Sequence, residues 1–249
     1  MIFAALVINN TCKSKIEGTM SLRLYLLVDG SRAGLFSRWG RAQRKVHDFI
    51  VKNVLMNMGE AMSDEYCSRG YPWCFVISAA ALKVNKYYIG SFIIQPGEAG
   101  VESLVIIYSA VSSPWLEKNM LAEYPLTFWA ARIFNNRQKS DFSDKKWKTL
   151  FQWVKALKRS YSPFWESFAL KKAWSFNTLS QVLLMEGSKE DYGIRINDGV
   201  EAMPWKSWPD CIQQEEGIWV WRQSRHRKIL DSRRIPLRGA EAKMPEAPF

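Results

Sequence analysis

The sequence contains few of the residues from which metal and redox sites are built. Its 249 residues include 4 Cys and 2 His. Cys67 and Cys74 are the nearest cysteine pair, and no Cys-x-x-Cys pair for zinc binding or redox chemistry occurs. We therefore expect free thiols in a reducing compartment, with no metal and no cofactor.

The sequence also lacks the local motifs of familiar enzymes. It has no Gly-x-Ser-x-Gly elbow, no phosphate-binding Gly-rich loop, no His-Glu-x-x-His and no calcium-binding loop. His47 lies in an expected helix and His226 in a basic run, and neither has a partner in a recognisable catalytic motif. We interpret both as surface or interface residues, and we expect that the protein is not an enzyme.

No stretch reaches the roughly 18 apolar residues of a membrane-spanning helix. The apolar opening, Met1–Ile8, has neither a preceding basic segment nor a small-residue cleavage site, so it is a poor signal peptide. The sequence from Met20 onward reads as the start of the domain. We expect residues 1–19 to be an N-terminal extension and the protein to be cytoplasmic.

What the sequence does have is positive charge and tryptophan. Lys and Arg number 35 against 24 Asp and Glu, which gives a net charge of +11, and there are 12 Trp. The hydrophobic content of 47% is that of a globular chain with a core. The charge favours an acidic partner: nucleic acid, anionic lipid or an acidic protein surface.

Hydrophobic periodicity predicts a mixed α/β fold. The connections between neighbouring strand-like runs are short, which favours antiparallel pairing. We expect a single domain over residues 20–238, with a mostly antiparallel sheet flanked by helices, and a flexible tail at 239–249. The expected strands are 22–28, 74–82, 87–95, 103–111, 124–129, 192–196 and 218–222, and the expected helices are 41–62, one from Ser143 and 162–185.

The C-terminal part combines tryptophan with positive charge. Trp219 and Trp221 lie on one face of the expected strand 218–222, either as a docking patch or as part of a strand that is apolar on both faces. The run 222–238 carries seven cations and one acid, Asp231, and is either a partner-binding or a solvated surface. We expect a partner-binding site made of Trp219, Trp221, Arg222, Arg225, Arg227, Lys228, Arg233 and Arg234.

Nucleic-acid binding is the alternative function. Aromatic residues interleaved with basic ones are typical of surfaces on which single strands stack. The nucleic-acid modules with recognisable sequence signatures are absent, so this alternative ranks below a protein partner. A second basic group spans Arg132–Arg159, where lysines on the outer side of a helix favour a solvated surface.

Several short passages occur in a characteristic order. Residues 58–66 lead into a strand at 73–78, and an aromatic-x-Gly strand at 88–92 runs up to Pro96. Residues 124–127 read Tyr-Pro-Leu-Thr, and the strand Ile218–Trp221 is followed by Ile235-Pro236. In this order the passages resemble the TagF/ImpM family, accessory proteins of the bacterial type VI secretion system.

The resemblance implies a non-enzymatic cytoplasmic regulator, which restrains assembly or firing of the secretion machine by binding other components. The partner it implies is the system's forkhead-associated scaffold protein. The sequence departs from the family in three places, one of which is a stretch of about 27 extra residues between Pro96 and Tyr124. The opening Gly-Lys-Leu-Pro-x-x-Gly-Asp-Phe is absent, and Leu121-Ala122 stand where the family has Gly-Arg.

Overall fold

Seven antiparallel strands form one open sheet in the order β1-β2-β5-β4-β3-β6-β7. The computed structural model describes residues 4–7, 22–28, 40–55, 72–96, 102–122, 124–138, 150, 152–158, 217–224 and 228–236. The strands are β1 (Ala4–Val7), β2 (Leu24–Val28), β3 (Trp73–Ile77), β4 (Tyr87–Pro96), β5 (Glu102–Val111), β6 (Gly217–Gln223) and β7 (Ile229–Pro236).

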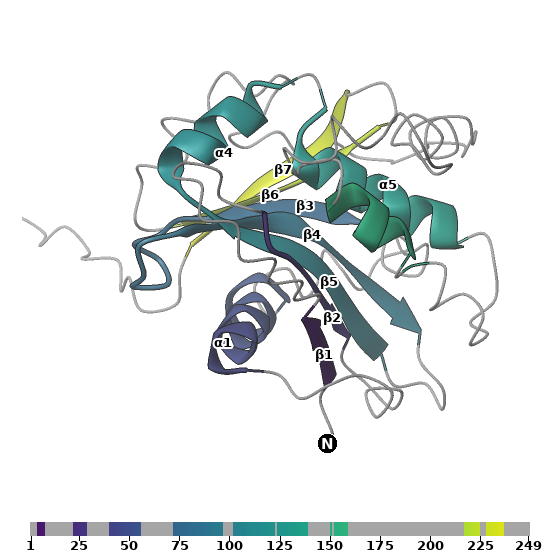
Figure 1. Cartoon of the computed structure of the whole chain (residues 1–249), viewed down its shortest axis with the longest axis horizontal. Coiled ribbons are helices and arrows are strands. Elements are labelled where there is room, and N and C mark those ends of the chain that lie inside the picture. Colours follow the sequence, from purple (N-terminus) through teal and green to yellow (C-terminus); the bar gives the residue numbers. More distant parts are fainter. Residues whose placement is uncertain are drawn as a thin grey trace, which may run out of the picture.

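Helices cover the sheet on both faces (Figure 1). The α-helix α1 (Arg41–Phe49) continues as the π-helix η2 (Ile50–Leu55) over one face, called here the α1 face. The opposite face, called the α5 face, is covered by α4 (Ser113–Met120), by α5 (Leu126–Gln138) and by helical residues 150 and 152–158. The core therefore has two apolar layers, one on each side of the sheet.

Strand β3 shows why two layers are needed. All five of its side chains are buried. Trp73, Phe75 and Ile77 belong to the α1-face layer, whereas Cys74 and Val76 belong to the α5-face layer. Because successive residues of a strand point to opposite faces, a strand that is apolar throughout is stable only when both faces are covered.

Gly90 allows β4 and β5 to approach each other closely. It lies between Phe75 on β3 and Tyr108 on β5 in the register of the sheet. A Cβ atom at position 90 would lie 2.1 Å from the carbonyl oxygen of Ile107 and 2.8 Å from Cα of Tyr108. Only glycine fits here, because the obstacles are backbone atoms of a paired strand. The ring of Tyr108 stacks on that of Tyr25, with centroids 5.0 Å apart.

The structure confirms the expected fold class, a mixed α/β domain with an antiparallel sheet flanked by helices. Pairing is antiparallel between β3 and β4 and between β4 and β5, as the short connections indicate. Within a residue or two at each end, four predicted strands match β2, β4, β5 and β6: 22–28, 87–95, 103–111 and 218–222.

Two expectations about secondary structure are wrong, and two elements were not expected. The strand at 74–82 ends at Ile77, where the hydroxyl of Ser78 accepts a hydrogen bond from the Ala81 amide at 3.1 Å and begins a turn. The strand at 124–129 is instead the start of α5, from Leu126. The basic run 222–238 contains a strand, β7, that was not expected, and α4 was not expected either.

Several expectations fall wholly or partly outside the described residues. These are the helix start at Ser143, the C-terminal end of the helix at 41–62, the helix at 162–185, the strand at 192–196 and the tail at 239–249. Within the range expected as an N-terminal extension, strand β1 pairs with β2. Residues 152–158 continue the helix expected from Ser143, and Val154 and Leu157 are buried on its inner side.

Replacing Gly90 by alanine tests the close approach of β4 and β5. We expect Gly90→Ala to lower the free energy of unfolding by about 3 kcal/mol, because the added methyl group meets backbone atoms that cannot move without breaking the strand ladder. Urea denaturation measures it. Gly40→Ala is the matched control, since its Cβ would meet only the movable Gln43 side chain and should cost less than about 1 kcal/mol. Equal losses in the two variants would contradict this account.

Candidate partner-binding site

The two tryptophans predicted as docking residues lie in the core. Trp219 and Trp221 on β6 point to the α5 face and are 4% and 0% exposed, while Ile218 and Val220 are buried on the α1 face. The strand is thus apolar on both faces, and the expectation that the two rings form an exposed docking centre is corrected. The physical reason is that β6 lies between β3 and β7, inside the sheet, and is covered on both sides.

Arg222, the next residue on β6, is also buried, and its contacts on the α1 face include an ion pair and an aromatic ring. Its Nη2 donates a hydrogen bond to Oδ2 of Asp231 at 2.8 Å, and the two side chains are 4% and 1% exposed. Its guanidinium carbon lies 4.6 Å from the centre of the Trp73 ring. A charge-assisted bond and a cation–π contact together stabilise a cation in a position that excludes water.

The register of the β6–β7 hairpin brings these groups together. Asp231 on β7 is directly opposite Arg222, so both side chains point to the same face. Arg233, two residues further along β7, points to that face as well. Its Nη2 lies 3.6 Å from Oδ2 of Asp231, and its guanidinium carbon lies 5.8 Å from the Trp73 ring centre. Two guanidinium groups thus share one carboxylate beside one indole ring.

The other described cations of the hairpin reach its surface. Lys228 and Arg234 are exposed, and Arg233 is 21% exposed. The guanidinium of Arg234 lies 5.3 Å from the ring of Trp219 on the other face. We call Lys228, Arg233 and Arg234 the cationic hairpin surface. Arg225 and Arg227, which were predicted to belong to the site, lie outside the described residues, as does His226.

Short hydrogen bonds close the loop of the hairpin. The amide of Ser224 donates to the carbonyl of Lys228 at 2.8 Å, and the amide of Lys228 donates to the hydroxyl of Ser224 at 3.1 Å. These reciprocal bonds fix the two ends of the loop relative to each other. The cation at Lys228 is therefore carried by an ordered backbone.

Sequence reasoning found the cations of this site but missed Trp73 and the part played by Asp231. Trp73 belongs to β3, far away in sequence, and only the β3–β6 pairing brings it beside Arg222. The signal available for Asp231 was that it is the one acid in a basic run. Such an acid is a candidate partner for a buried arginine on the neighbouring strand.

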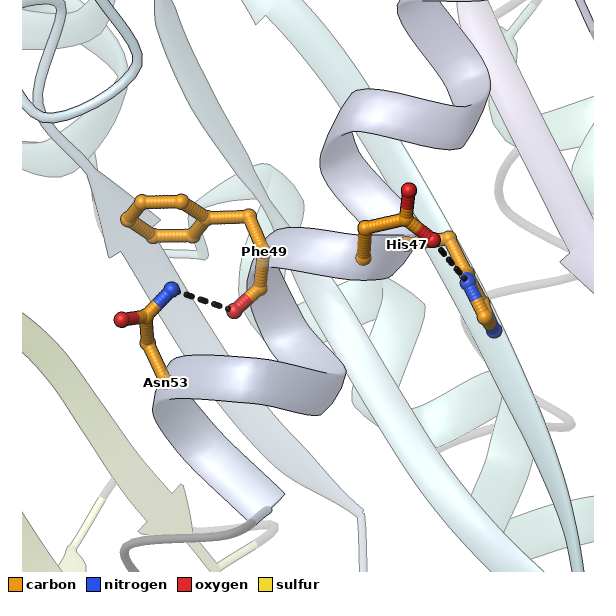
Figure 2. A network of polar contacts seen from close by, with 4 residues as sticks. His47, Phe49 and Asn53 are labelled. Atoms are coloured by element: carbon orange, nitrogen blue, oxygen red, sulfur yellow. Dashed lines mark hydrogen bonds and ion pairs between the residues drawn. The ribbon is translucent and has the colours of Figure 1, made fainter. Parts of the chain in front are cut away.

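Helix α1 carries a second group of exposed cations, and its inner side holds His47. The exposed charged residues of α1 and η2 are Arg41, Arg44, Lys45, Asp48 and Lys52, four cations and one acid. His47 is buried rather than at the surface, which corrects that expectation, and its Nδ1 lies 3.2 Å from Oδ1 of Asp48 (Figure 2). That contact ties the ring to the surface of its own helix.

The transition from α1 to the π-helix is marked by a side-chain hydrogen bond. Nδ2 of Asn53 donates to the carbonyl of Phe49 at 3.0 Å, four residues earlier (Figure 2). A π-helical turn displaces backbone amides from the carbonyls that they would meet in an α-helix. The side-chain amide of Asn53 donates to the Phe49 carbonyl in place of a backbone amide. The inner side of the helix stays apolar through this turn, with Ile50 and Val54 buried.

In the described part of the chain, no group of three or more His, Cys, Asp or Glu side chains is placed to hold a metal ion. Cys74 is a buried free thiol whose Sγ lies 3.4 Å from the carbonyl of Thr127, and burial raises its pKa well above the usual range. That thiol is therefore protonated and unreactive at neutral pH. Among the described helices, none is long and apolar enough to cross a membrane.

Comparison with known proteins gives no family assignment. No family model matches the chain, and neither a curated protein nor a solved structure matches it.

Removing the carboxylate of Asp231 tests how the hairpin is held. We expect Asp231→Asn to lower the free energy of unfolding by about 3 to 5 kcal/mol, because Arg222 keeps its buried charge and loses the carboxylate that balances it. Guanidinium denaturation measures the loss. The double variant Arg222→Met/Asp231→Leu removes both charges and should recover most of the stability. Asp48→Asn, at an exposed acid, is the control, and a loss there as large as at Asp231 would contradict the burial argument.

Proposed function

We propose that the protein is a non-enzymatic accessory protein of a type VI secretion system, which acts by binding another component and so restrains assembly or firing. The observation that carries the binding part of the proposal is the cationic hairpin surface, held by the buried Arg222–Asp231 pair and by aromatic rings. The short passages that resemble the TagF/ImpM family support the secretion-system part. The passages fall at least in part on described elements, namely β3, β4, the start of α5, and β6 with β7.

Pre-organisation is the physical basis of the binding proposal. A long cationic side chain loses rotamer entropy when a partner fixes it, and this cost weakens many surface charge contacts. Here the guanidinium of Arg233 lies near the Trp73 ring and that of Arg234 near the Trp219 ring, so both are already placed. Less entropy is then lost on binding, and an acidic partner is also attracted and oriented by the charges.

The chemistry of the site supports an acidic protein surface as the partner. The implied candidate is the forkhead-associated scaffold of the secretion system. Because Trp219 and Trp221 are core residues, their substitution would disturb the fold and would not report on a contact. The informative positions are the exposed cations of the hairpin.

Charge reversal at the hairpin tests this proposal. With purified proteins, we expect Lys228→Glu/Arg234→Glu to reduce capture of the forkhead-associated scaffold at least about tenfold, because attraction at two exposed positions becomes repulsion. Quantitative co-purification at low salt measures the effect. In cells, the same variant should release secretion that the native protein restrains.

The matched control is Arg44→Glu/Lys45→Glu, which makes the same change of charge on the exposed side of α1. It should leave capture near the native level. Capture that falls equally in both variants would point to net charge and not to the hairpin. Unchanged capture in the hairpin variant would show that the partner binds elsewhere or that the protein has another function.

Nucleic-acid binding remains the second candidate, favoured by the exposed cations of α1 and η2. Base stacking receives no support from the tryptophans of β3 and β6, because Trp73, Trp219 and Trp221 are all buried. If nucleic acid is the partner, contacts to phosphates should dominate, and the affinity should fall steeply as salt rises. Fluorescence anisotropy with labelled duplex and single-stranded DNA and RNA measures it. We expect no binding at low salt, and a steep salt dependence would favour this candidate instead.

A further inference from the structure

Three tyrosines of neighbouring strands form a row of packed rings on the α1 face. They are Tyr25 on β2, Tyr108 on β5 and Tyr88 on β4. Tyr108, on the middle strand, is 1% exposed, and its ring centroid lies 5.0 Å from that of Tyr25 and 5.9 Å from that of Tyr88. The two outer tyrosines are half-buried. The row therefore has two partly exposed rings, each supported by a buried one.

Two aromatic rings at this separation suit a segment in the polyproline II conformation. That helix has three residues per turn and rises about 3.1 Å per residue, so two prolines three positions apart lie on one side, about 9 Å from each other. The rings of Tyr25 and Tyr88 are separated by no more than the sum of their two distances to Tyr108. Surfaces lined by aromatic rings bind Pro-x-x-Pro segments in this way.

The hydroxyl of Tyr88 is suited to donate a hydrogen bond to such a segment. Its burial and the neighbouring Tyr25 raise the pKa of Tyr88 above the usual range, so the phenol is protonated at neutral pH. A polyproline II backbone has no internal hydrogen bonds, and its carbonyl groups are therefore open to a donor.

The chain itself has one Pro-x-x-Pro segment, Pro245–Pro248, and it follows the last described strand. The segment lies outside the described residues, but the place where the described chain leaves the sheet is fixed by the register. Strand β7 ends at Pro236, opposite Gly217 of β6. Through β6 and β3 this is the end of the sheet at which β4 begins, with Tyr88 opposite the last residue of β3.

The segment is long enough to reach both outer tyrosines. Three strand spacings separate β7 from β4 and five separate it from β2, which corresponds to about 14 and about 24 Å. Nine residues lead from Pro236 to Pro245. An extended chain of that length spans about 30 Å.

The turn that precedes Tyr88 adds a match of charge. Lys83 and Lys86 are exposed in this turn, and Glu246 stands between the two prolines of the segment. Two backbone hydrogen bonds, from the amides of Lys83 and Val84, close the turn. Lys83 has a φ of 52°, a conformation in which glycine is preferred, and its side chain is carried by this fixed backbone.

We propose that Tyr25 and Tyr88 bind the Pro245–Pro248 segment of the same chain, one proline on each ring, with Glu246 beside the lysines of the turn. This contact goes beyond the proposed function and is independent of it, because its rings belong to strands outside the cationic hairpin surface.

Fluorescence anisotropy with a labelled peptide that copies residues 243–249 tests the contact. A segment joined by a short linker competes at an effective concentration in the mM range. The peptide should therefore bind the full-length variant Pro245→Ala/Pro248→Ala at least about tenfold more tightly than the native chain, whose own segment occupies the rings. A peptide with alanine in place of both prolines should bind that variant at least about tenfold more weakly.

Tyrosine variants in the Pro245→Ala/Pro248→Ala background locate the binding surface. Tyr88→Leu removes the ring and the hydroxyl and should weaken peptide binding about tenfold. Tyr87→Leu is the matched control, since Tyr87 is also half-buried on β4 but packs on the α5 face, and it should leave the affinity unchanged. Tyr88→Phe keeps the ring, should give an intermediate affinity, and carries the test if Tyr88→Leu fails to fold, which far-UV circular dichroism would show.

The outcomes that would overturn the contact are distinct. Equal peptide affinity for the native chain and the double proline variant would overturn the chain's own segment as the occupant, and dependence on Tyr88 would then assign the surface to a Pro-rich segment of another protein. No binding to the double proline variant, or equal losses at Tyr87 and Tyr88, would overturn the tyrosine surface itself. None of these variants changes a residue of the hairpin, so scaffold capture and peptide binding can fail separately.

Discussion

Strand β3 has apolar side chains on both faces, and the layered arrangement of the domain follows from this constraint. Phe75 cannot be buried unless a helix covers the α1 face, and Val76 cannot be buried unless helices cover the α5 face. Each fully buried side chain of this size contributes about 2 to 3 kcal/mol. The close approach at Gly90 and the position of β6 beside β3 both depend on the same sheet.

The hairpin that carries the candidate site is an extension of this packed sheet. Its inner strand, β6, has Trp219 and Trp221 in the α5-face layer and Val220 in the α1-face layer, so its backbone is fixed by the core. Among the described residues of the hairpin, the exposed charged side chains are those of Arg234 on the edge strand β7 and of Lys228 just before it. Charged residues on an edge strand also discourage pairing with other chains. The cationic residues thus protect the edge, and they form the surface that we propose binds an acidic partner.

The sequence was informative where composition and breaks between segments agreed. The Val, Ile and aromatic content of β4 and β5, together with the short Pro-Gly-containing segment between them, was enough to predict both strands. The start of α5, by contrast, is rich in aromatic residues of high strand propensity, and its residues 126–134 are all buried, so no amphipathic stripe reveals a helix. Strand β7 was hidden because its middle is polar, from Asp231 to Arg234. An unused signal for α4 was Ser112 followed by Pro114, a helix start.

The location of the site was predictable in part, and its composition was not. The positive run at 222–238 identified the hairpin, but exposure could not be deduced from it. Trp219 is covered by helices that lie elsewhere in the sequence, and Arg222 is buried because Asp231 balances its charge. These are tertiary facts, since they depend on strand register and on the pairing of β6 with β3.

A single extra residue in β7 determines which face receives the charges. Gln223 pairs with Ile229 and Arg222 with Asp231, so Leu230 is the additional residue of a β-bulge. If the bulge were absent and regular pairing continued from Gln223 and Ile229, Leu230 would lie opposite Arg222. Asp231 would then lie opposite Trp221, on the α5 face and away from Arg222. Two buried charges would then be separated, at a cost of several kcal/mol. The ion pair therefore selects the bulged register, and that register places Arg233 beside the ring of Trp73.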